Sequence, residues 1–502
     1  MTPLTPTATL NDRLARARAA QAGWRSLPIR RRLTPVQAFR HLLVSECDDL
    51  CAAVARDLGK PAVETLACEI LPLADACRFL ERQAARLLRP RRVPGRLRPL
   101  WLLGERETVH RRPRGVVGII GTWNYPLYLN GTQMVQALAA GNAVLWKPSE
   151  VAPASAAALH ALMIRAGFPV ELCPMLEATR EAGQALTDAA VDHIVFTGSA
   201  ATGRAIARKL GERLISSTLE LSGCDALFAL EDADVSLAAR AAWFGATLNR
   251  GQTCLAVRRA FVQRPVYAAF AEALRELAAR AGPARLALPA QTRLVEQLVN
   301  DALAEGGKML IDAPPGEGDA CAPRVVLDAR PEMALCQEAS FAPVTAVLPF
   351  ADVEEALRME SRCPYALGAS VFTQDERKAL RLAGELRAGM VAINDAIAST
   401  AHPATPFGGR GDSGWGVTQG AEGLLEMTVP QVVSVRGGRF RPHYELAMGQ
   451  GAERQMEMLR GVLESSHAPT MGQRLRGWWR LLRGARHLLS PLSPEAGERG
   501  RV

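Results

Sequence analysis

The sequence predicts an α/β protein with two sheet domains whose strands are mostly parallel. Its 502 residues exceed the roughly 250–300 residues at which a single hydrophobic core stops growing. Short apolar segments such as GVVGIIG (115–121) and NAVLWKP (142–148) alternate with alanine-rich helical segments, and a second alternating series runs over residues 227–394. Strands that alternate with helices imply right-handed crossovers and a parallel sheet.

Composition and charge indicate a soluble globular protein. Apolar residues make up 48% and charged residues 22% of the chain, and no signal segment or apolar run of about 18 residues is evident. We therefore expect a cytoplasmic protein. The ten cysteines form no CxxC pair and no zinc-ligand cluster, so free thiols and no metal are expected. We interpret the net charge of +9 as a result of arginine-rich composition and expect no nucleic-acid partner.

The first part of the chain reads as a helical layer followed by an arm. Apolar residues recur at three- and four-residue spacing from Thr9 to about Leu88, with expected breaks over residues 28–35 and at the LGKP turn (58–61). Residues 89–115 are rich in proline, glycine and charge, which favours a connecting arm or an edge hairpin.

A glycine-containing turn in the first alternating series is typical of phosphate binding. Gly198 and Ser199 directly follow an apolar strand, and Gly203 stands where the next helix begins. Such a turn points backbone N–H groups and a helix N-terminus at the ligand, here expected to be a dinucleotide. The spacing differs from the GxGxxG fingerprint, and strand-to-helix turns also use glycine for structural reasons.

The segment LWKPSE (145–150) ends the preceding strand with groups suited to a ribose. Lys147 and Glu150 can both hydrogen-bond vicinal hydroxyls, and the loop between them contains Ser149 and a rigid proline. A solvated strand end is the alternative interpretation.

Three further segments carry candidate reacting groups. Asn124, next to Trp123 in GTWNYPLYL (121–129), can donate a hydrogen bond to a developing oxyanion. Glu220 stands alone in an apolar strand, where a carboxylate is costly unless it is paired or serves as a base. Cys254, in LNRGQTCLAV (248–257), is either a packing residue or a nucleophile.

The segments WNYP, KPSE, GSAATG, LELSG and GQTC, in this order, resemble the aldehyde dehydrogenase superfamily, and the class-three or fatty aldehyde dehydrogenase branch in particular. The resemblance runs from about Arg30 to Val435 and includes PFGG (406–409) and SGWG (413–416). It implies a Rossmann-type cofactor domain, a second α/β catalytic domain and a small β oligomerisation arm. The implied ranges are 1–98 and 116–223 for the cofactor domain, 224–416 for the catalytic domain, 99–115 and 417–436 for the arm, and 437–502 for a tail.

The resemblance also implies a reaction and roles for residues. In the implied reaction Cys254 attacks an aldehyde, and Asn124 and the Cys254 backbone N–H hold the resulting negative oxygen. Hydride then passes to NAD, with NADP as an alternative. Finally, Glu220 activates the water molecule that releases the acid. The implied substrate is a medium- or long-chain aliphatic or an aromatic aldehyde. The residues expected to bind the cofactor are Trp123, Lys147, Ser149, Glu150, Gly198, Ser199, Gly203 and Phe341.

Two motifs depart from the family pattern. The family's EEIFGP motif corresponds to EASFAP within QEASFAP (337–343), where Ala339 replaces the glutamate that hydrogen-bonds the nicotinamide ribose. The family's ELGGK motif appears here as ELSGC (220–224). Losing that carboxylate should weaken cofactor binding by about 1–3 kcal/mol. These departures make a catalytically reduced scaffold an alternative to an aldehyde-oxidising enzyme. A CoA-acylating enzyme is a second alternative, against which the presence of Glu220 argues.

The tail contains a basic amphipathic helix at residues 471–490. Met471, Leu475, Trp478, Leu482, Ala485 and Leu489 share one face, Arg476, Arg480 and Arg483 lie opposite, and Arg474 and Arg486 flank the apolar stripe. We expect this helix either to lie on an anionic membrane surface, at the inner face of the membrane, or to pack on the catalytic domain or a partner subunit. The strand-like arm favours a homodimer.

Overall fold

The computed structural model describes residues 9–102, 104–312, 318–437, 441, 444 and 452–489. Within this range the chain forms two compact units. We call Met1–Arg89 with Arg111–Val429 the main unit, and Pro90–His110 with Pro430–Val502 the arm unit.

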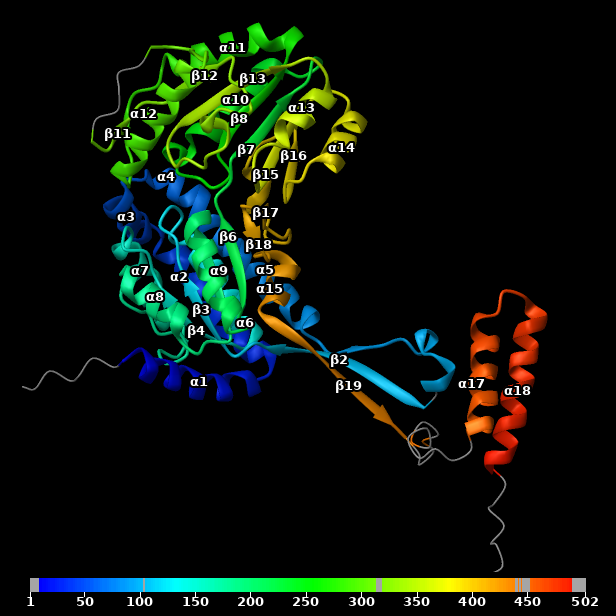
Figure 1. Cartoon of the computed structure of the whole chain (residues 1–502). Coiled ribbons are helices and arrows are strands. Elements are labelled where there is room, and N and C mark those ends of the chain that lie inside the picture. The colour runs from blue at the N-terminus through cyan, green and yellow to red at the C-terminus, as the bar shows by residue number, and fades with distance from the viewer. Residues whose placement is uncertain are drawn as a thin grey trace, which may run out of the picture. The chain divides into compact units, whose positions relative to one another are not determined.

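The first sheet of the main unit is built from the predicted short apolar strands (Figure 1). Its five strands have the order β18-β6-β5-β3-β4, and all pairs except β18 with β6 are parallel. The strands are β3 (Val116–Ile120), β4 (Ala143–Lys147), β5 (His193–Gly198), β6 (Ser216–Leu221) and β18 (Gly414–Trp415). Every residue of β3 and β4 is buried, as expected for a parallel sheet with helices on both faces.

Helices surround this sheet, and all of them except α15 come from the first half of the chain. They are α1 (Leu10–Ser26), α2 (Ile29–Ser45), α3 (Cys47–Leu58), α4 (Ala62–Thr65), the π-helical turn η1 (Leu66–Ile70), α5 (Leu71–Leu87), α6 (Tyr128–Ala140), α7 (Pro153–Arg165), α8 (Arg180–Asp188), α9 (Ala200–Glu212) and α15 (Gly420–Glu426). The expected break at residues 28–35 is too wide, because only Leu27 and Pro28 separate α1 from α2 and Pro35 is buried inside α2. Burial against the helical layer compensates for the backbone hydrogen bond that this proline cannot make.

The second sheet of the main unit has seven strands in the order β10-β12-β13-β8-β7-β15-β16. They are β7 (Asp225–Ala229), β8 (Val257–Gln263), β10 (Lys308–Met309), β12 (Arg324–Leu327), β13 (Val344–Phe350), β15 (Gly368–Phe372) and β16 (Met390–Ile393). Its helices are α10 (Val235–Thr247), α11 (Arg264–Ala278), α12 (Pro289–Ala304), α13 (Val353–Glu360) and α14 (Glu376–Glu385). The predicted fold class, two α/β sheets with mostly parallel strands, is confirmed.

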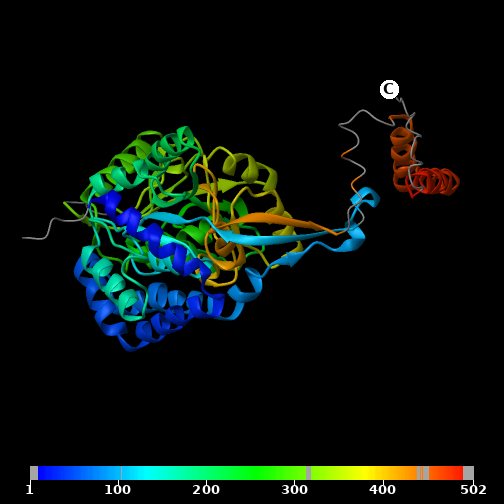
Figure 2. The same ribbon diagram turned by 90° about the horizontal axis from the view of Figure 1, so that it is seen from below.

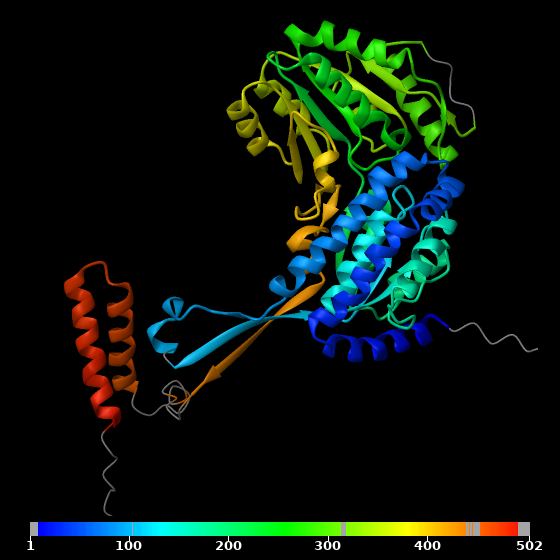
Figure 3. The ribbon, with the colours of Figure 1, turned by 180° about the vertical axis from the view of Figure 1, so that it is seen from behind.

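The arm unit combines a narrow sheet with a helical hairpin. Strands β1 (Arg91–Arg92), β2 (Glu105–Pro113) and β19 (Thr428–Arg436) form a sheet in the order β1-β2-β19, and Figure 2 shows β2 and β19 side by side. Helices α17 (Ala452–His467) and α18 (Met471–Leu489) lie against each other in Figure 3. In the described part of the chain, none of the helices has both the length and the apolar character required to cross a bilayer.

Candidate active site

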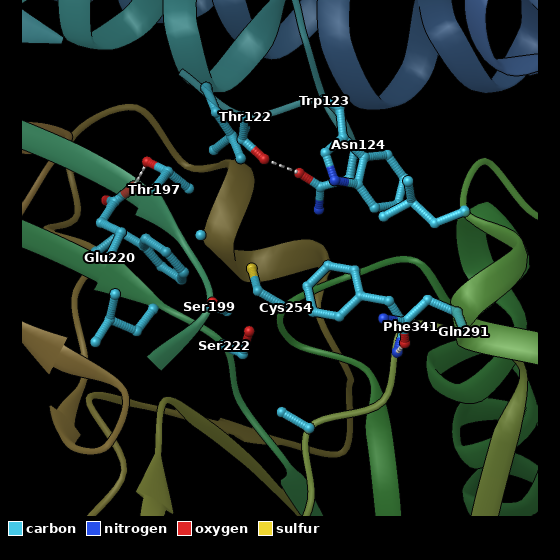
Figure 4. Close-up of a pocket in the computed structure, with 16 residues that line it drawn as sticks. Thr122, Trp123, Asn124, Thr197, Ser199, Glu220, Ser222, Cys254, Gln291 and Phe341 are labelled. Atoms are coloured by element: carbon cyan, nitrogen blue, oxygen red, sulfur yellow. Dashed lines mark hydrogen bonds between the residues drawn. The ribbon is translucent and has the colours of Figure 1, made fainter. Parts of the chain in front are cut away.

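A cavity of about 170 Å³ in the main unit brings the three candidate reacting side chains together (Figure 4). Cys254, Glu220 and Asn124 line it, although they come from a loop, from strand β6 and from the loop after β3. Figure 4 shows the Cys254 sulfur pointing into the space between Glu220 and Asn124. Four of the predicted cofactor residues also line the cavity, namely Trp123, Gly198, Ser199 and Phe341.

A left-handed turn positions Cys254. Asn249, Arg250 and Gly251 have φ values of 50°, 57° and 73°, a conformation that L-residues rarely adopt. A Cβ at Gly251 would lie 2.3 Å from the backbone carbon of Ala342, so only glycine fits there. Strained backbone of this kind persists only where the surrounding structure enforces it, which is common at functional sites.

Hydrogen bonds join this turn to the Asn124 loop. The Asn249 side-chain Nδ2 donates to the Asn124 carbonyl at 2.9 Å, and the Asn124 Nδ2 donates to the Gln252 carbonyl at 3.0 Å. The Tyr125 and Thr253 hydroxyls are 2.7 Å apart. The predicted nucleophile and the predicted oxyanion donor are therefore held by one network, in which the Asn124 amide uses one of its two N–H donors.

A buried ion pair beneath the Asn124 loop was missed by sequence reasoning. Lys60 Nζ lies 2.6 Å from Glu69 Oε1, and neither side chain is exposed. Lys60 also donates to the Asn124 carbonyl at 2.8 Å, and Glu69 accepts the Leu127 N–H at 2.8 Å. The LGKP motif indicated only a turn, and nothing in the sequence identified Glu69 or the Asn124 carbonyl as partners of its lysine.

Glu220 is buried and receives three side-chain hydrogen bonds. Gln133 Nε2 donates to it at 3.0 Å and Thr197 Oγ1 at 3.3 Å, and the Thr418 hydroxyl donates to its other oxygen. Burial raises the pKa of the Glu220 carboxyl to about 7, and the hydrogen bonds from Thr418, Thr197 and Gln133 oppose that rise. A carboxyl group with this pKa is suited to general-base chemistry near neutral pH. Sequence reasoning identified Glu220 but not Gln133, Thr197 or Thr418.

The Cys254 thiol is protonated at neutral pH in this state. Burial, followed by the charges of Asp225 and Glu220, raises the pKa of the Cys254 thiol to about 12. The side chain is nevertheless partly accessible from the cavity. Since the thiolate is the nucleophile, the sulfur must lose its proton as it attacks.

The carboxyl ends of β4 and β5 form a second group of candidate residues next to the cavity. These strands flank β3, and Lys147 at the end of β4 donates to Glu150 at 3.0 Å. Ser149 is buried and accepts the Val151 N–H at 3.3 Å. Lys147, Ser149 and Glu150 do not line the cavity of Cys254, but an ammonium and a carboxylate at this position match the hydroxyls of a ribose.

The turn after β5 supplies the remaining predicted cofactor residues. Ser199 caps α9 by accepting the Thr202 N–H, so the helix N-terminus opens beside the cavity. Gly203 lies on the sheet side of α9, where a Cβ would approach Leu221 to 2.5 Å. Positive helix ends at carboxyl strand edges suit the phosphates of a dinucleotide, so the residues present fit NAD(P).

The two motif departures also lie at the site. Ala339 lines the cavity next to Phe341, whose N–H donates to Gln291 at 2.8 Å. Cys224 is buried, and its Sγ donates to the Cys336 carbonyl at 3.7 Å. The hydrogen bonds described above for Asn124 and Glu220 do not involve Ala339 or Cys224.

Comparisons with known proteins agree on one family. The model of the aldehyde dehydrogenase family matches residues 2–433. The chain is 34% identical over 440 residues to 4,4'-diapolycopene aldehyde oxidase from Methylomonas sp., covering 85% of this chain and 82% of the relative. It is 33% identical over 454 residues to a Mycobacterium ulcerans protein named "Putative succinate-semialdehyde dehydrogenase" for NADP(+), with 86% of each covered.

Solved structures show the same fold. An aldehyde dehydrogenase from Mycobacterium tuberculosis, crystallised with NAD+, matches with a TM-score of 0.80 at 29% identity, covering 87% of this chain and 92% of the other. PnpE from Pseudomonas sp. WBC-3 matches with a TM-score of 0.80 at 30% identity, covering 87% and 91%.

Proposed function

This chain belongs to the aldehyde dehydrogenase family and is an NAD(P)-dependent aldehyde-oxidising enzyme. We propose that it converts a neutral, apolar aldehyde to the carboxylic acid through a thioester on Cys254. The observation that carries the proposal is that one cavity contains a partly accessible thiol, a carboxyl group with a pKa near 7 and a side-chain amide.

The proposed covalent steps balance as follows. The Cys254 sulfur releases its proton to water and bonds to the aldehyde carbon as the carbonyl π bond breaks, and the Asn124 amide donates to the oxygen that becomes negative. NAD(P), held by the residues described above, would supply the acceptor for the hydride that leaves this carbon. The remaining thioester is then attacked by water, the carbon–sulfur bond breaks, and the acid and the free thiol are released.

Glu220 is the proposed base in the second half of the reaction. In its ionised form it takes a proton from the water that attacks the thioester. Its three hydrogen-bond donors, Gln133, Thr197 and Thr418, hold the carboxylate in place and stabilise its charge. Water rather than coenzyme A is therefore the acceptor that we propose.

The cavity supports a substrate without a second charge. Its lining includes the apolar side chains Trp123, Leu129, Leu288, Phe341 and Phe407, and no lysine or arginine occurs among the lining residues that the structure describes. A semialdehyde with a carboxylate would leave that charge without a cationic partner, which is costly in a desolvated site. We therefore propose a medium- or long-chain aliphatic or an aromatic aldehyde, in keeping with the class-three or fatty-aldehyde resemblance.

For the cofactor we propose NAD as the better substrate and NADP as an alternative. Lys147 and Glu150 would hold the ribose hydroxyls, with Ser149 between them, and the α9 N-terminus after Gly198 and Ser199 would receive the phosphates. A carboxylate at Glu150 repels a 2′-phosphate, although its partners Lys147 and Arg180 offset part of that charge.

A substrate panel tests the proposal. Purified enzyme with NAD or NADP should produce absorbance at 340 nm with decanal or benzaldehyde, with kcat/KM at least tenfold above that for succinate semialdehyde. Cys254→Ala should abolish the signal. Turnover that requires coenzyme A would favour the acylating alternative, and no turnover with any aldehyde and either cofactor would favour the reduced scaffold.

We also propose a homodimer. Strand β19 stands at the end of the order β1-β2-β19, and most of its residues are exposed. An open edge with exposed valines is suited to pairing with a second copy. Sedimentation equilibrium would measure the mass, and a monomer at micromolar concentration would contradict this proposal.

A further inference from the structure

The net charge of this protein is concentrated in the arm unit. Residues 90–110 and 430–502 contain seventeen arginines, eight glutamates, no lysine and no aspartate, which gives +9. The whole chain also has a net charge of +9, so the main unit is neutral. The excess positive charge is therefore not spread evenly along the chain. A strongly basic arm unit beside a neutral main unit indicates that the arm unit binds an anionic partner.

Helices α17 and α18 pair through small residues rather than through apolar stripes. A Cβ at Gly477 would lie 2.3 Å from the Ser465 backbone nitrogen, and a Cβ at Gly484 would lie 2.6 Å from Met458. Arg480 also faces α17, where it forms an ion pair with Glu464 at 3.2 Å. Glycines allow this close approach of the two backbones, so the pairing does not use the apolar stripe of α18.

The apolar stripe of α18 is exposed on the opposite side of the helix. It comprises Met471, Leu475, Trp478, Trp479 and Leu482, which are between 46% and 75% exposed. At about 100° per residue these side chains lie on the face opposite Gly477 and Gly484. The side chains of Ala485, Arg486 and Leu489, which the sequence also placed on or beside the stripe, lie outside the described residues.

Arginines border this stripe on both sides. Arg474 lies at one edge. Because the exposed stripe also includes Trp479, Arg476 and Arg483, which the sequence placed opposite the stripe, lie nearest its other edge. All three arginines are exposed. No acidic residue occurs in α18. The helix therefore presents an apolar face with two tryptophans between cationic edges, which is the pattern of helices that lie in a membrane interface.

The corresponding stripe of α17 is exposed to a similar extent, with Met456, Leu459 and Leu463 between 49% and 62% exposed. Met456, Leu459 and Leu463 line a groove of about 680 Å³ together with Leu97 and Trp101, which belong to the turns that precede β2. No described residue of the arm unit buries the stripe of α18 either. An external apolar surface is needed to bury it, and α18 differs from α17 in having arginines and no acidic residue beside its stripe.

We propose that α18 binds the surface of a bilayer containing anionic lipids, with its stripe among the acyl chains near the headgroups and its arginines at the phosphates. Charge complementarity selects an anionic surface, and the exposed tryptophans and leucines select a lipid surface over a nucleic acid, whose phosphates would engage only the arginines. Binding of this kind leaves the chain on one side of the membrane and does not depend on the reaction that the main unit catalyses.

Co-sedimentation of the full-length protein with vesicles tests the proposal. Phosphatidylcholine vesicles with 30% phosphatidylglycerol should pellet the protein, and pure phosphatidylcholine vesicles should not. The variant Arg474→Gln/Arg476→Gln/Arg483→Gln should reduce partitioning on the order of tenfold or more, since each arginine near an anionic surface contributes about fivefold. The matched variant Arg16→Gln/Arg56→Gln/Arg208→Gln removes the same charge from exposed helix positions of the main unit and should pellet like wild type.

The tryptophans separate a membrane from the other candidate partners. Trp478→Ser/Trp479→Ser keeps the charge, and it should lower vesicle binding at least tenfold while aldehyde oxidation and the circular dichroism spectrum stay unchanged. Equal pelleting of all variants would overturn the proposal. The proposal would also be overturned if the protein bound a labelled DNA duplex through these arginines and did not bind vesicles. A change of oligomeric state in the tryptophan variant with no vesicle binding by wild type would make the stripe a subunit contact instead.

Discussion

The buried ammonium of Lys60 lies 2.8 Å from the backbone carbonyl of Asn124, the residue whose amide faces the cavity of Cys254. The same ammonium forms an ion pair with Glu69, and it lies 4.2 Å from the centre of the Tyr125 ring. The pair thus links the helical layer of the main unit to the loop that carries the proposed oxyanion donor. Lys60 acts as a positioning residue, because its contact with the Asn124 loop is through the backbone.

Replacing Lys60 should separate stability from catalysis. Lys60→Met leaves the Glu69 carboxylate buried without its partner, which should cost about 3–5 kcal/mol in the free energy of unfolding. Lys60→Met/Glu69→Gln removes both charges but keeps an acceptor for the Leu127 N–H, so most of that stability should return. The bond to Asn124 is absent from both variants, and kcat should remain reduced on the order of tenfold in both.

Urea unfolding and steady-state kinetics measure these two quantities. Lys209→Met is the control, because it breaks an exposed pair with Asp188 and should change stability by less than about 1 kcal/mol. Full recovery of kcat in the double variant would show that the Lys60 bond to the Asn124 loop does not position it for catalysis.

Glu220→Gln should stop the reaction at the thioester. The first turnover should still release about one equivalent of reduced cofactor, because hydride transfer precedes the step in which Glu220 acts. Steady-state turnover should fall on the order of 10²–10⁴-fold, the usual contribution of a general base. Stopped-flow absorbance at 340 nm and intact mass spectrometry would detect the burst and the acyl adduct on Cys254. Steady-state loss without a burst or an adduct would assign Glu220 to an earlier step.

The pH profile should depend on Thr418. Because the ionised Glu220 is the proposed base, activity should rise with pH through the pKa of about 7. The Thr418 hydroxyl stabilises the ionised form, so Thr418→Val should raise the Glu220 pKa and move this limb about one to two pH units higher. The variant should be slow at pH 7 and recover at pH 9.

Thr34→Val is the control for this profile, since Thr34 donates to the Arg30 carbonyl on an exposed face of α2. Measurement of kcat/KM from pH 5 to 10 compares the three proteins. An unshifted limb in Thr418→Val, at any absolute rate, would mean that another group titrates.

Sequence patterns were sufficient for the fold and for the groups in the cavity. Buried parallel strands produce uninterrupted apolar segments, so β3, β4, β5 and the strands of the second sheet were visible as such. Cys254, Glu220 and Asn124 were each ambiguous alone, and they were identified through the ordered motifs that resemble the aldehyde dehydrogenase superfamily. The structure places them in one cavity, and their individual roles remain predictions that the variants above test.

The contacts that tune these groups could not be predicted in the same way. Thr418 is 198 residues from Glu220 along the chain, and Asn249 is 125 residues from Asn124. Hydrogen bonds between such distant residues depend on which strands and loops the fold brings together, and the spacing of residues along the sequence does not show this. The arm unit gives a related example, because helical periodicity identified the stripe of α18 but could not show that its glycine face is the one that packs.

Gly251→Ala should show how much the left-handed turn before Cys254 matters. Alanine at a φ of 73° is disfavoured by about 1–2 kcal/mol, and its Cβ would also meet the Ala342 backbone at 2.3 Å. The turn must therefore shift, which would misplace Cys254 relative to Asn124 and lower kcat on the order of 10²-fold even at temperatures where the variant is folded. Gly23→Ala is the matched control, because Gly23 lies within α1 with no atom within 4 Å of an added Cβ, and it should stabilise the protein by about 0.5–1 kcal/mol at unchanged kcat. Thermal unfolding and kinetics at 15 °C measure both effects, and a folded Gly251→Ala enzyme with wild-type kcat would show that the turn is not needed to hold the nucleophile.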